Sequence, residues 1–237
     1  MQHSNYMKFL IVFSLIGIMV LSCKAKVKPA ENHDSILEGE IVFKITYPQE
    51  SDPQDFSFIY PKEMTLYFRE SYQKISFKGS MGMYYFDFIY GEKSDTVYTL
   101  LKIQLFNKKL YSHTSGERLL IFSESPEDRI TVFTDETKEI AGMIAKQALL
   151  KPKNKNIPDI EVWYSESLPI TSPNNNTPFH QIPGILLESE IVYEKVTFIF
   201  SAQTISFKKI PDDVFKIPSD YKLTNISEIE ELLYTVF

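Results

Sequence analysis

The stretch Leu187–Phe207, which reads LESEIVYEKVTFIFSAQTISF, decides the fold class of this chain. The odd-numbered positions of residues 187–193 are apolar or small, whereas Glu188 and Glu190 stand between them. Such alternation is typical of a strand with one buried face. Residues 196–207 follow after two charged residues and predict an antiparallel partner strand.

Similar strand patterns cover most of the remaining chain, separated by short polar breaks. They lie at residues 41–47, 64–68, 75–77, 83–90, 97–106, 108–113, 130–133, 144–150 and 160–164. Strands about ten residues apart with few helical stretches predict a mainly β fold, a single antiparallel sheet of meander or barrel-like form. Residues 83–90 and 97–106 are apolar on both faces, so we expect them to be covered on both sides or to line a cavity.

Helical signals are confined to two places. Ser227 and Glu230 have the spacing of a capping box and predict a C-terminal helix. A second short helix is predicted near residues 117–122. The longest predicted loop, residues 165–180, contains three prolines, and we expect it to be mobile at the surface.

The composition fits a β-rich domain and argues against nucleic acid as a partner. The chain has 237 residues, with 18 Phe, 14 Tyr and 8 Gly, and aromatic side chains suit a pleated, half-buried surface. The formal net charge is −6, and losing Lys8 with residues 1–22 makes it −7, because that segment holds no acidic residue. An acidic domain without a basic stripe cannot neutralise a phosphate backbone.

The N-terminus predicts export and lipidation. Lys8 and the apolar residues 9–21 have the pattern of a signal peptide, and Ser22 precedes Cys23, the single cysteine. A membrane-spanning helix needs about 20 apolar residues, which this stretch does not reach. The junction resembles a bacterial lipobox and implies that residues 1–22 are removed and that acyl chains such as palmitate fasten Cys23 to membrane lipid. A short membrane anchor, or an ordinary signal peptide with a chance cysteine, is the alternative.

Residues 23–34 predict a lipidated flexible tether, and residues 35–237 a single β-rich domain. The tether is polar, contains Pro29 and lacks periodicity. Lys24 rather than Asp follows the cysteine, which argues against retention in the inner membrane in the pattern of enteric bacteria. We therefore place the protein in the bacterial cell envelope, lipid-anchored in the outer membrane and facing the periplasm.

The sequence specifies no reaction, no metal site and no cofactor. His180 is the one candidate general base, because it ends the long predicted loop, although a solvated histidine is the simpler interpretation. Glu188 and Glu190 share a strand face and are a candidate acid pair, although a strand that resists aggregation explains them more simply. We expect a non-enzymatic protein, with an envelope-acting hydrolase as the alternative.

Aromatic residues in three predicted strands are candidates for lining a ligand cavity. They are Tyr84, Phe86, Phe88, Tyr90, Phe198 and Phe200. Packing in an ordinary sheet core is the alternative interpretation of these side chains.

Residues 181–188, which read QIPGILLE, resemble the GLPGLI motif of a family of Bacteroidetes envelope proteins. Gln181 replaces the first glycine of the motif and Ile182 the first leucine, so order and spacing fit better than identity. The resemblance extends over residues 137–221, about a third of the chain, and includes IAG at 140–142 and VWY at 162–164. Members often carry a cysteine shortly after IAG, where this chain has Ala145.

These sequences are similar to LolA and LolB, the lipoprotein carriers of the bacterial envelope. The resemblance implies an incomplete antiparallel β-barrel with one or two short helices, and a lipid or a lipoprotein acyl chain as ligand. Pro183 fixes its φ and Gly184 permits a positive φ, so this pair predicts a turn into the strand at residue 187. We expect a membrane-anchored module that binds an apolar ligand or an envelope partner. A purely structural lipoprotein is a third alternative, and the sequence leaves the oligomeric state open.

Overall fold

The computed structural model describes residues 38–48, 57–69, 71–91, 96–115, 129–153, 158–168, 170, 173–175, 177–193 and 196–234. Residues 36–237 form one compact unit, distinct from residues 1–35. The predicted signal peptide, Cys23, the tether and the helix predicted near residues 117–122 lie outside the described residues.

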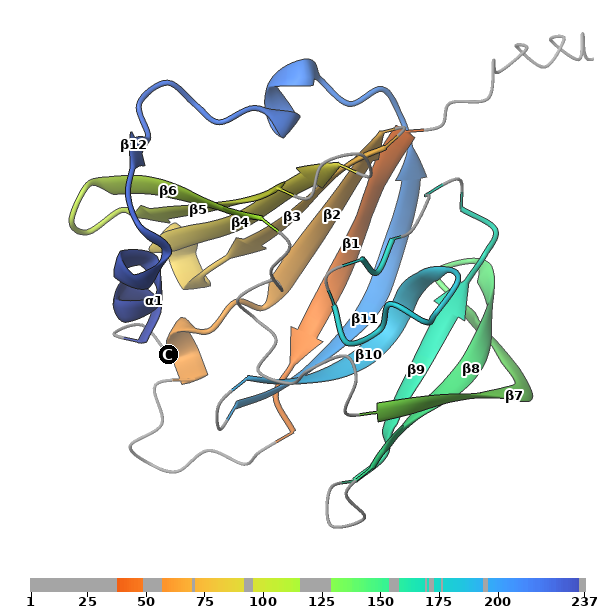
Figure 1. Ribbon diagram of the computed structural model, residues 1–237. Helices are drawn as coiled ribbons and strands as arrows, with labels where there is room; N and C mark the ends of the chain where they lie inside the picture. The colour runs from red at the N-terminus through yellow and green to blue at the C-terminus, as the bar shows by residue number, and fades with distance from the viewer. Residues whose placement is uncertain are drawn as a thin grey trace, which may run out of the picture. The chain divides into compact units, whose positions relative to one another are not determined.

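The described residues form twelve strands in one sheet (Figure 1). The strands are β1 (Glu38–Thr46), β2 (Glu63–Arg69), β3 (Tyr72–Lys78), β4 (Tyr84–Gly91), β5 (Thr96–Ile103), β6 (Lys108–Ser115), β7 (Arg129–Ile140), β8 (Met143–Pro152), β9 (Ile160–Ser165), β10 (Ile185–Tyr193), β11 (Val196–Phe207) and β12 (Lys222–Leu223). The order across the sheet is β12-β6-β5-β4-β3-β2-β1-β11-β10-β9-β8-β7, and neighbours pair antiparallel except β12 with β6. The prediction of a mainly β, antiparallel fold is confirmed.

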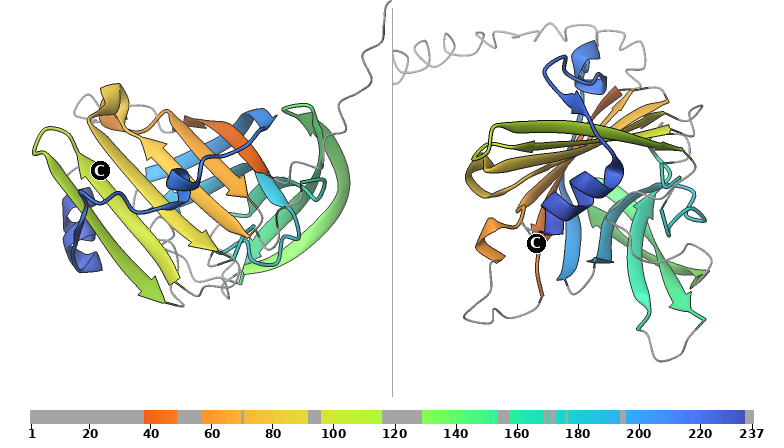
Figure 2. Two further views of the ribbon diagram at one scale, coloured as in Figure 1. Left: turned by 90° about the horizontal axis from the view of Figure 1, so that it is seen from above. Right: turned by 60° about the vertical axis from the view of Figure 1, so that its left-hand side comes forward.

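The sheet is open, because β7 and β12 lie at opposite ends of the strand order. Residues 38–115 build β1–β6 and residues 129–207 build β7–β11, and the two halves meet where β1 pairs with β11. The sheet twists along this order, as Figures 1 and 2 show. Among the described residues, no helix has the length and apolarity needed to cross a membrane.

One face of the sheet carries the core, and we call it the inner face. The alternation in β1 places Ile41, Phe43 and Ile45 on this face, each at most 3% exposed. The strand register aligns Ile41 with Leu66 of β2 on one side and with Ile205 of β11 on the other. The inner face therefore continues without interruption from one half of the sheet to the other.

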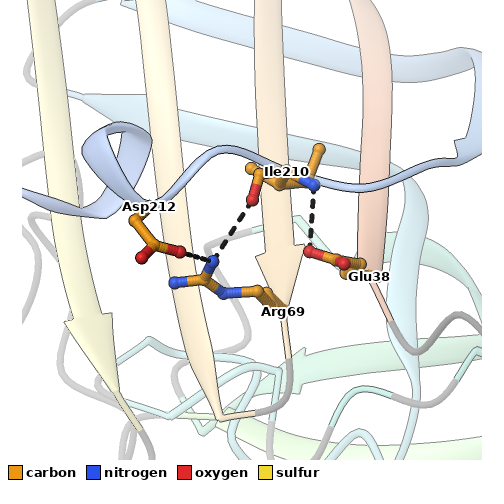
Figure 3. Close-up of polar contacts among 4 residues, drawn as sticks. All are labelled: Glu38, Arg69, Ile210 and Asp212. Atoms are coloured by element: carbon orange, nitrogen blue, oxygen red, sulfur yellow. Dashed lines mark hydrogen bonds and ion pairs between the residues drawn. The ribbon is translucent and has the colours of Figure 1, made fainter.

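Residues 208–224, which we call the outer strap, cross the opposite, outer face from β1 to β6. Figure 3 shows the part of the strap that contacts Glu38 and Arg69. The Ile210 amide donates to Oε2 of Glu38 at 2.9 Å, and Nη1 of Arg69 donates to the Ile210 carbonyl at 3.2 Å and to Oδ1 of Asp212 at 2.5 Å. Asp220 pairs with Lys109 farther along. The strap ends in β12, which adds to the edge of β6.

The outer strap explains why β4 and β5 are apolar on both faces. Ile89 of β4 and Leu100 of β5 point outward in the strand register but are only 4% and 1% exposed. Asp87 also points outward, and it lies 2.9 Å from Nζ of Lys74 and accepts a hydrogen bond from Ser76 at 2.6 Å. The expectation that these strands are covered on both sides is confirmed.

The C-terminal helix is confirmed, but its cap differs from the predicted one. Helix α1 spans Ile226–Tyr234, and the Glu228 amide donates to Oδ1 of Asn225 at 2.8 Å. Asn225 is therefore the N-cap, and Ser227 lies inside the first turn. Ile229 and Leu233 of α1 are buried in the core.

Candidate ligand-binding face

Aromatic rings of the inner face pack against one another across β3, β4 and β11. The ring centroids of Phe86 and Phe88 lie 4.7 Å apart, and Phe77 lies 6.4 Å from Phe86 and 6.2 Å from Phe200. Phe198 and Phe200 are stacked at 6.2 Å. These contacts join the two halves of the sheet through aromatic pairs, a geometry that adds to the stabilisation from burial alone.

All six predicted cavity residues lie on this inner face, and none is more than 7% exposed. Two of them are tyrosines, whose pKa values burial raises well above the ordinary value, so that both stay neutral at physiological pH. The hydroxyl of Tyr90 donates to Oε1 of Gln73 at 3.2 Å. The face is thus apolar and uncharged, with isolated polar atoms.

The described residues between β9 and β10, namely 166–168, 170, 173–175 and 177–184, are called the inner segment, and part of it lies against the inner face. Leu168, Ile170, Phe179 and Ile182 are buried, at 6%, 8%, 2% and 2% exposure. Apart from Ser165, which ends β9, the loop predicted at residues 165–180 contains no strand or helix among its described residues, but Leu168, Ile170 and Phe179 are buried and so do not lie at the surface. Their spacing shows neither a helical nor a strand period, so the pattern gave no sign of burial.

Asn174 holds the inner segment in its folded form. Its Nδ2 donates to the carbonyl of Ile182 at 3.0 Å and to that of Gly184 at 2.8 Å, and the residue is 5% exposed. Thr177 Oγ1 donates to the Asn174 carbonyl at 2.7 Å and accepts from the Phe179 amide at 3.1 Å. These bonds satisfy backbone groups that would otherwise be buried without partners.

Gly184 is required by close packing and not by its φ angle. A Cβ at this position would lie 2.3 Å from the Ser165 carbonyl oxygen and 2.8 Å from the Glu166 amide nitrogen. Gly184 is not among the positive-φ glycines, so the turn does not use the positive φ that a glycine permits. Strand β10 begins at Ile185, directly after the Pro183-Gly184 pair and two residues earlier than expected.

A cavity of about 80 Å³ lies between the inner segment and the sheet. Tyr90 and Phe200 line it, whereas the other four predicted cavity residues pack elsewhere in the core. The polar residues around it are Gln73, Asn174, Thr177, Glu188 and Ser189. Ligand pockets usually measure about 300 Å³ or more, so the cavity is too small for a long acyl chain while the inner segment is in place.

Two larger hollows lie away from the inner face, at the surface. One, of about 470 Å³, lies between the outer strap and β3–β5 and is lined by Tyr72, Tyr98 and Phe215 among others. The other, of about 440 Å³, is lined by Lys108, Lys109 and neighbouring residues beside the β5–β6 turn. Neither contains a predicted cavity residue except Tyr90, which the first hollow touches.

The structure does not unite the candidate catalytic residues. His180 is exposed, and the structure gives its side chain no hydrogen bond or ion pair within the described part of the chain. Glu188 points to the outer face, where its Oε1 lies 2.5 Å from Nζ of Lys138 and its Oε2 accepts from Ser201. Lys138 also lies 4.2 Å from the Trp163 ring, so Glu188 belongs to a packed surface network and not to a pair with Glu190.

Comparisons with known proteins concern the fold. No protein-family model and no curated protein matches the chain. Two crystal forms of PNGF-II are similar at 13% and 14% identity, with TM-scores of 0.51 and 0.50, over 84% of this chain and 33% of theirs. This chain therefore spans about a third of the length of PNGF-II. The likeness shows a shared fold and nothing about a ligand.

Two further solved structures are more distant. An uncharacterized conserved protein from Thermus thermophilus has 7% identity and a TM-score of 0.44 over 79% of this chain and 90% of its own. MucB has 9% identity and a TM-score of 0.34 over 77% of this chain and 58% of its own. At these TM-scores neither structure informs the function.

Proposed function

We propose that this protein is a membrane-anchored envelope lipoprotein whose inner face binds an apolar ligand, namely a lipid or a lipoprotein acyl chain. The observation that carries the proposal is the combination of an open sheet, a continuous apolar inner face and a cover made of one non-strand segment. In this proposal the sheet is an incomplete barrel of the LolA/LolB type, and the inner segment occupies the place of the ligand.

The chemistry of the inner face suits a hydrocarbon chain. Its rings and aliphatic side chains carry no charge, and the tyrosines on it are kept neutral by burial. Transfer of each methylene from water to such a surface contributes about 0.8 kcal/mol. The few polar atoms near the cavity, on Gln73, Asn174 and Ser189, are suited to the polar end of the ligand.

Binding requires displacement of the inner segment, because the cavity of about 80 Å³ holds no chain of useful length. The segment is suited to act as a lid, since it is fixed by side-chain packing and by the Asn174 amide and adds no strand to the sheet. When the inner segment opens, the apolar surface that Phe179 and Ile182 cover becomes exposed. A ligand that takes their place would bury this surface again and so favour the open state.

Anchorage rests on the N-terminal sequence. Acylation of Cys23 would keep the sheet unit beside a membrane, and two or more acyl chains are needed for stable attachment. We place the protein in the outer membrane, facing the periplasm. Metabolic labelling with a fatty-acid probe tests this step: the native chain should be labelled and Cys23→Ala should not be.

The ligand is tested by native mass spectrometry of the full chain released from membranes in mild detergent. We expect a co-purifying lipid, and competition by a fluorescent fatty acid for the same site. Asn174→Ala should raise fatty-acid uptake because it loosens the inner segment, whereas the exposed neighbour Asn175→Ala should behave as the native chain does. A chain without bound lipid, together with equal uptake by both variants, would contradict the proposal.

A further inference from the structure

Four large apolar side chains project into solvent from three neighbouring loops at one end of β2–β6. They are Phe58 at 62%, Met81 at 91%, Leu105 at 82% and Phe106 at 64% exposure. They lie in the short 3-10 helix Ser57–Ile59, in the 3-10 helix Ser80–Gly82 and in the turn between β5 and β6. We call these three loops the loop tips (Figure 1).

Hydrogen bonds fix the three loop tips to one another. The Gln104 amide donates to the Met83 carbonyl at 2.8 Å, which joins the second loop to the third. Ser80 Oγ donates to the Tyr60 carbonyl at 3.4 Å, which joins the second loop to the first. The four exposed apolar side chains are therefore carried by three loops that are held together at one end of the sheet, and we call these side chains the patch.

Met81 lies in a tight turn between β3 and β4. Met81 has φ of 53° and Gly82 has φ of 71°, and the Met83 amide donates to the Ser80 carbonyl at 3.1 Å, which closes the turn. A left-handed φ favours Gly or Asn over a long side chain. The Met81 side chain is 91% exposed, so neither the turn nor the core requires an apolar group there.

The loop tips and the adjoining strand ends are rich in lysine, and Asp220 and Glu228 pair with two of these lysines. Residues 57–63, 78–84 and 102–109 contain five lysines and one carboxylate, Glu63. The lysines are Lys62, Lys78, Lys102, Lys108 and Lys109. This local charge contrasts with the formal net charge of −6 for the whole chain. Apolar side chains ringed by lysines are typical of surfaces that enter the interface of an anionic bilayer.

A hollow suited to a lipid phosphate lies directly beside the β5–β6 turn. It has a volume of about 440 Å³ and is lined by Asn107, Lys108, Lys109, Leu110, Asp220 and Lys222. Three lysines contribute to its lining beside the carboxylate of Asp220, which pairs with Lys109. Lys108 lies 4.0 Å from Glu228, at the limit of an ion pair, and so retains capacity for an anion.

We propose that the loop tips are a membrane-docking surface: Phe58, Met81, Leu105 and Phe106 enter the interface of an anionic bilayer while the adjacent lysines contact lipid phosphates. The surface orients the sheet on the membrane that Cys23 anchors, so the inference rests on the proposed anchorage but not on the proposed ligand. The second exposed apolar group, on β7 and β8, lacks this character, because Asp135, Glu136 and Glu139 lie within β7.

The test uses the full chain, reconstituted in phosphatidylglycerol–phosphatidylcholine vesicles whose acyl chains carry bromine, which quenches tryptophan. Phe106→Trp reports on the loop tips, and Phe133→Trp, 51% exposed on β7, is the matched control. The native Trp163 is 7% exposed and contributes the same background to both. We expect strong quenching in Phe106→Trp and none above background in Phe133→Trp.

Two further variants, made in the Phe106→Trp background, separate the apolar and basic parts. Met81→Gly relieves the left-handed strain and removes the apolar group, so the fold should be preserved while quenching falls about threefold or more. Lys108→Gln with Lys109→Gln should reduce quenching about tenfold at low salt, whereas the exposed pair Lys151→Gln with Lys153→Gln should not. Vesicles of phosphatidylcholine alone should reproduce the loss in the Lys108 and Lys109 variant.

Each contrary result has a distinct meaning. A chain that sediments with vesicles but leaves the Phe106→Trp reporter unquenched would overturn the docking surface and leave the anchorage intact. A chain that does not sediment with vesicles at all would overturn both. The reporter could also be quenched by no lipid and yet be crosslinked to an envelope protein in cells. That result would overturn membrane docking and would show that the loop tips bind a protein.

Discussion

The inner segment and the outer strap lie on opposite faces of the sheet and are held there by different kinds of interaction. The inner segment buries Leu168, Ile170, Phe179 and Ile182 and is held by neutral hydrogen bonds from Asn174. In the outer strap, residues 208–224, one side chain is buried, that of Ile210. Its other anchors are ion pairs of Asp212 and Asp220, the ring of Phe215 and the backbone pairing of β12 with β6. Both segments lack regular strand pairing over most of their described length. They differ in the interactions that hold them on the sheet in place of backbone hydrogen bonds between strands.

The inner segment and the outer strap should therefore respond differently to pH and to salt. Apolar burial and neutral hydrogen bonds change little with pH or salt, whereas exposed ion pairs weaken in both salt and acid. We expect the inner segment to open for a ligand and the outer strap to loosen in acid. Substitutions in each segment, compared with exposed control positions, test whether the two segments are held by these different interactions.

The largest expected effect is at Phe179, in the centre of the inner segment. Phe179→Ala removes a ring that is 2% exposed and should lower the free energy of unfolding by about 3–5 kcal/mol. The adjacent, exposed His180→Ala should change it by less than about 0.5 kcal/mol. Urea unfolding measures both, and similar values for the two variants would show that the inner segment is not packed on the sheet.

The next effect is at Asn174. Asn174→Ala leaves the buried carbonyls of Ile182 and Gly184 without their donor and should cost about 1–3 kcal/mol. Asn175→Ala, at an exposed neighbour, is the matched control. Thermal unfolding followed by circular dichroism distinguishes them, and an unchanged midpoint in Asn174→Ala would mean that packing alone fixes the inner segment.

Much of the sheet could be predicted from the sequence, since period-2 alternation reports the face that each strand buries. β10 and β11 follow directly from the pattern of residues 187–207, and β8 follows IAG as predicted. For β7, which spans Arg129–Ile140, the pattern predicts only residues 130–133. At IAG the structure has Ala141 at φ of 50° and Gly142 at φ of 80°, a two-residue hairpin turn that was not predicted from the sequence.

The two covering segments could not be predicted, because neither has a periodic signal. The burial of Phe179 depends on contacts with strands far away in sequence, and a single Phe in a proline-rich stretch reads as a loop. The hydrogen bonds of Asn174 could not be predicted from the sequence either, because the stretch NNNTP indicates only a turn. The six aromatic candidates all lie on the inner face, and the position of the inner segment decides which of them line the cavity.

A smaller effect is expected at the outer strap. Arg69→Gln removes hydrogen bonds to Ile210 and Asp212 and a cation–π contact of 4.9 Å with Phe215, and should cost about 1–2 kcal/mol. Lys146→Gln breaks the exposed pair with Glu166 and should leave the free energy of unfolding nearly unchanged, because solvent screens such a pair. Equal losses in urea unfolding would mean that the strap adds nothing beyond an ordinary surface ion pair.

The smallest effect is the response of the outer strap to acid. The hydrogen bond from Arg69 lowers the pKa of Asp212, and that from Lys109 lowers the pKa of Asp220. Because both pKa values are lower in the folded state, the stabilisation from these pairs is present above the ordinary Asp value of about 3.9 and is lost as pH falls through the lowered folded values.

Hydrogen exchange can read the two covers separately as the pH falls. The Ile210 amide, which donates to Glu38, reports on the outer strap, and the Ile182 amide, which donates to the Phe179 carbonyl at 2.8 Å, reports on the inner segment. After correction for intrinsic exchange, protection at Ile210 should fall below about pH 4 while that at Ile182 persists. Simultaneous loss of protection at both amides would mean that the inner segment and the outer strap open in one cooperative step. The different interactions that hold them would then not give them separate responses to pH.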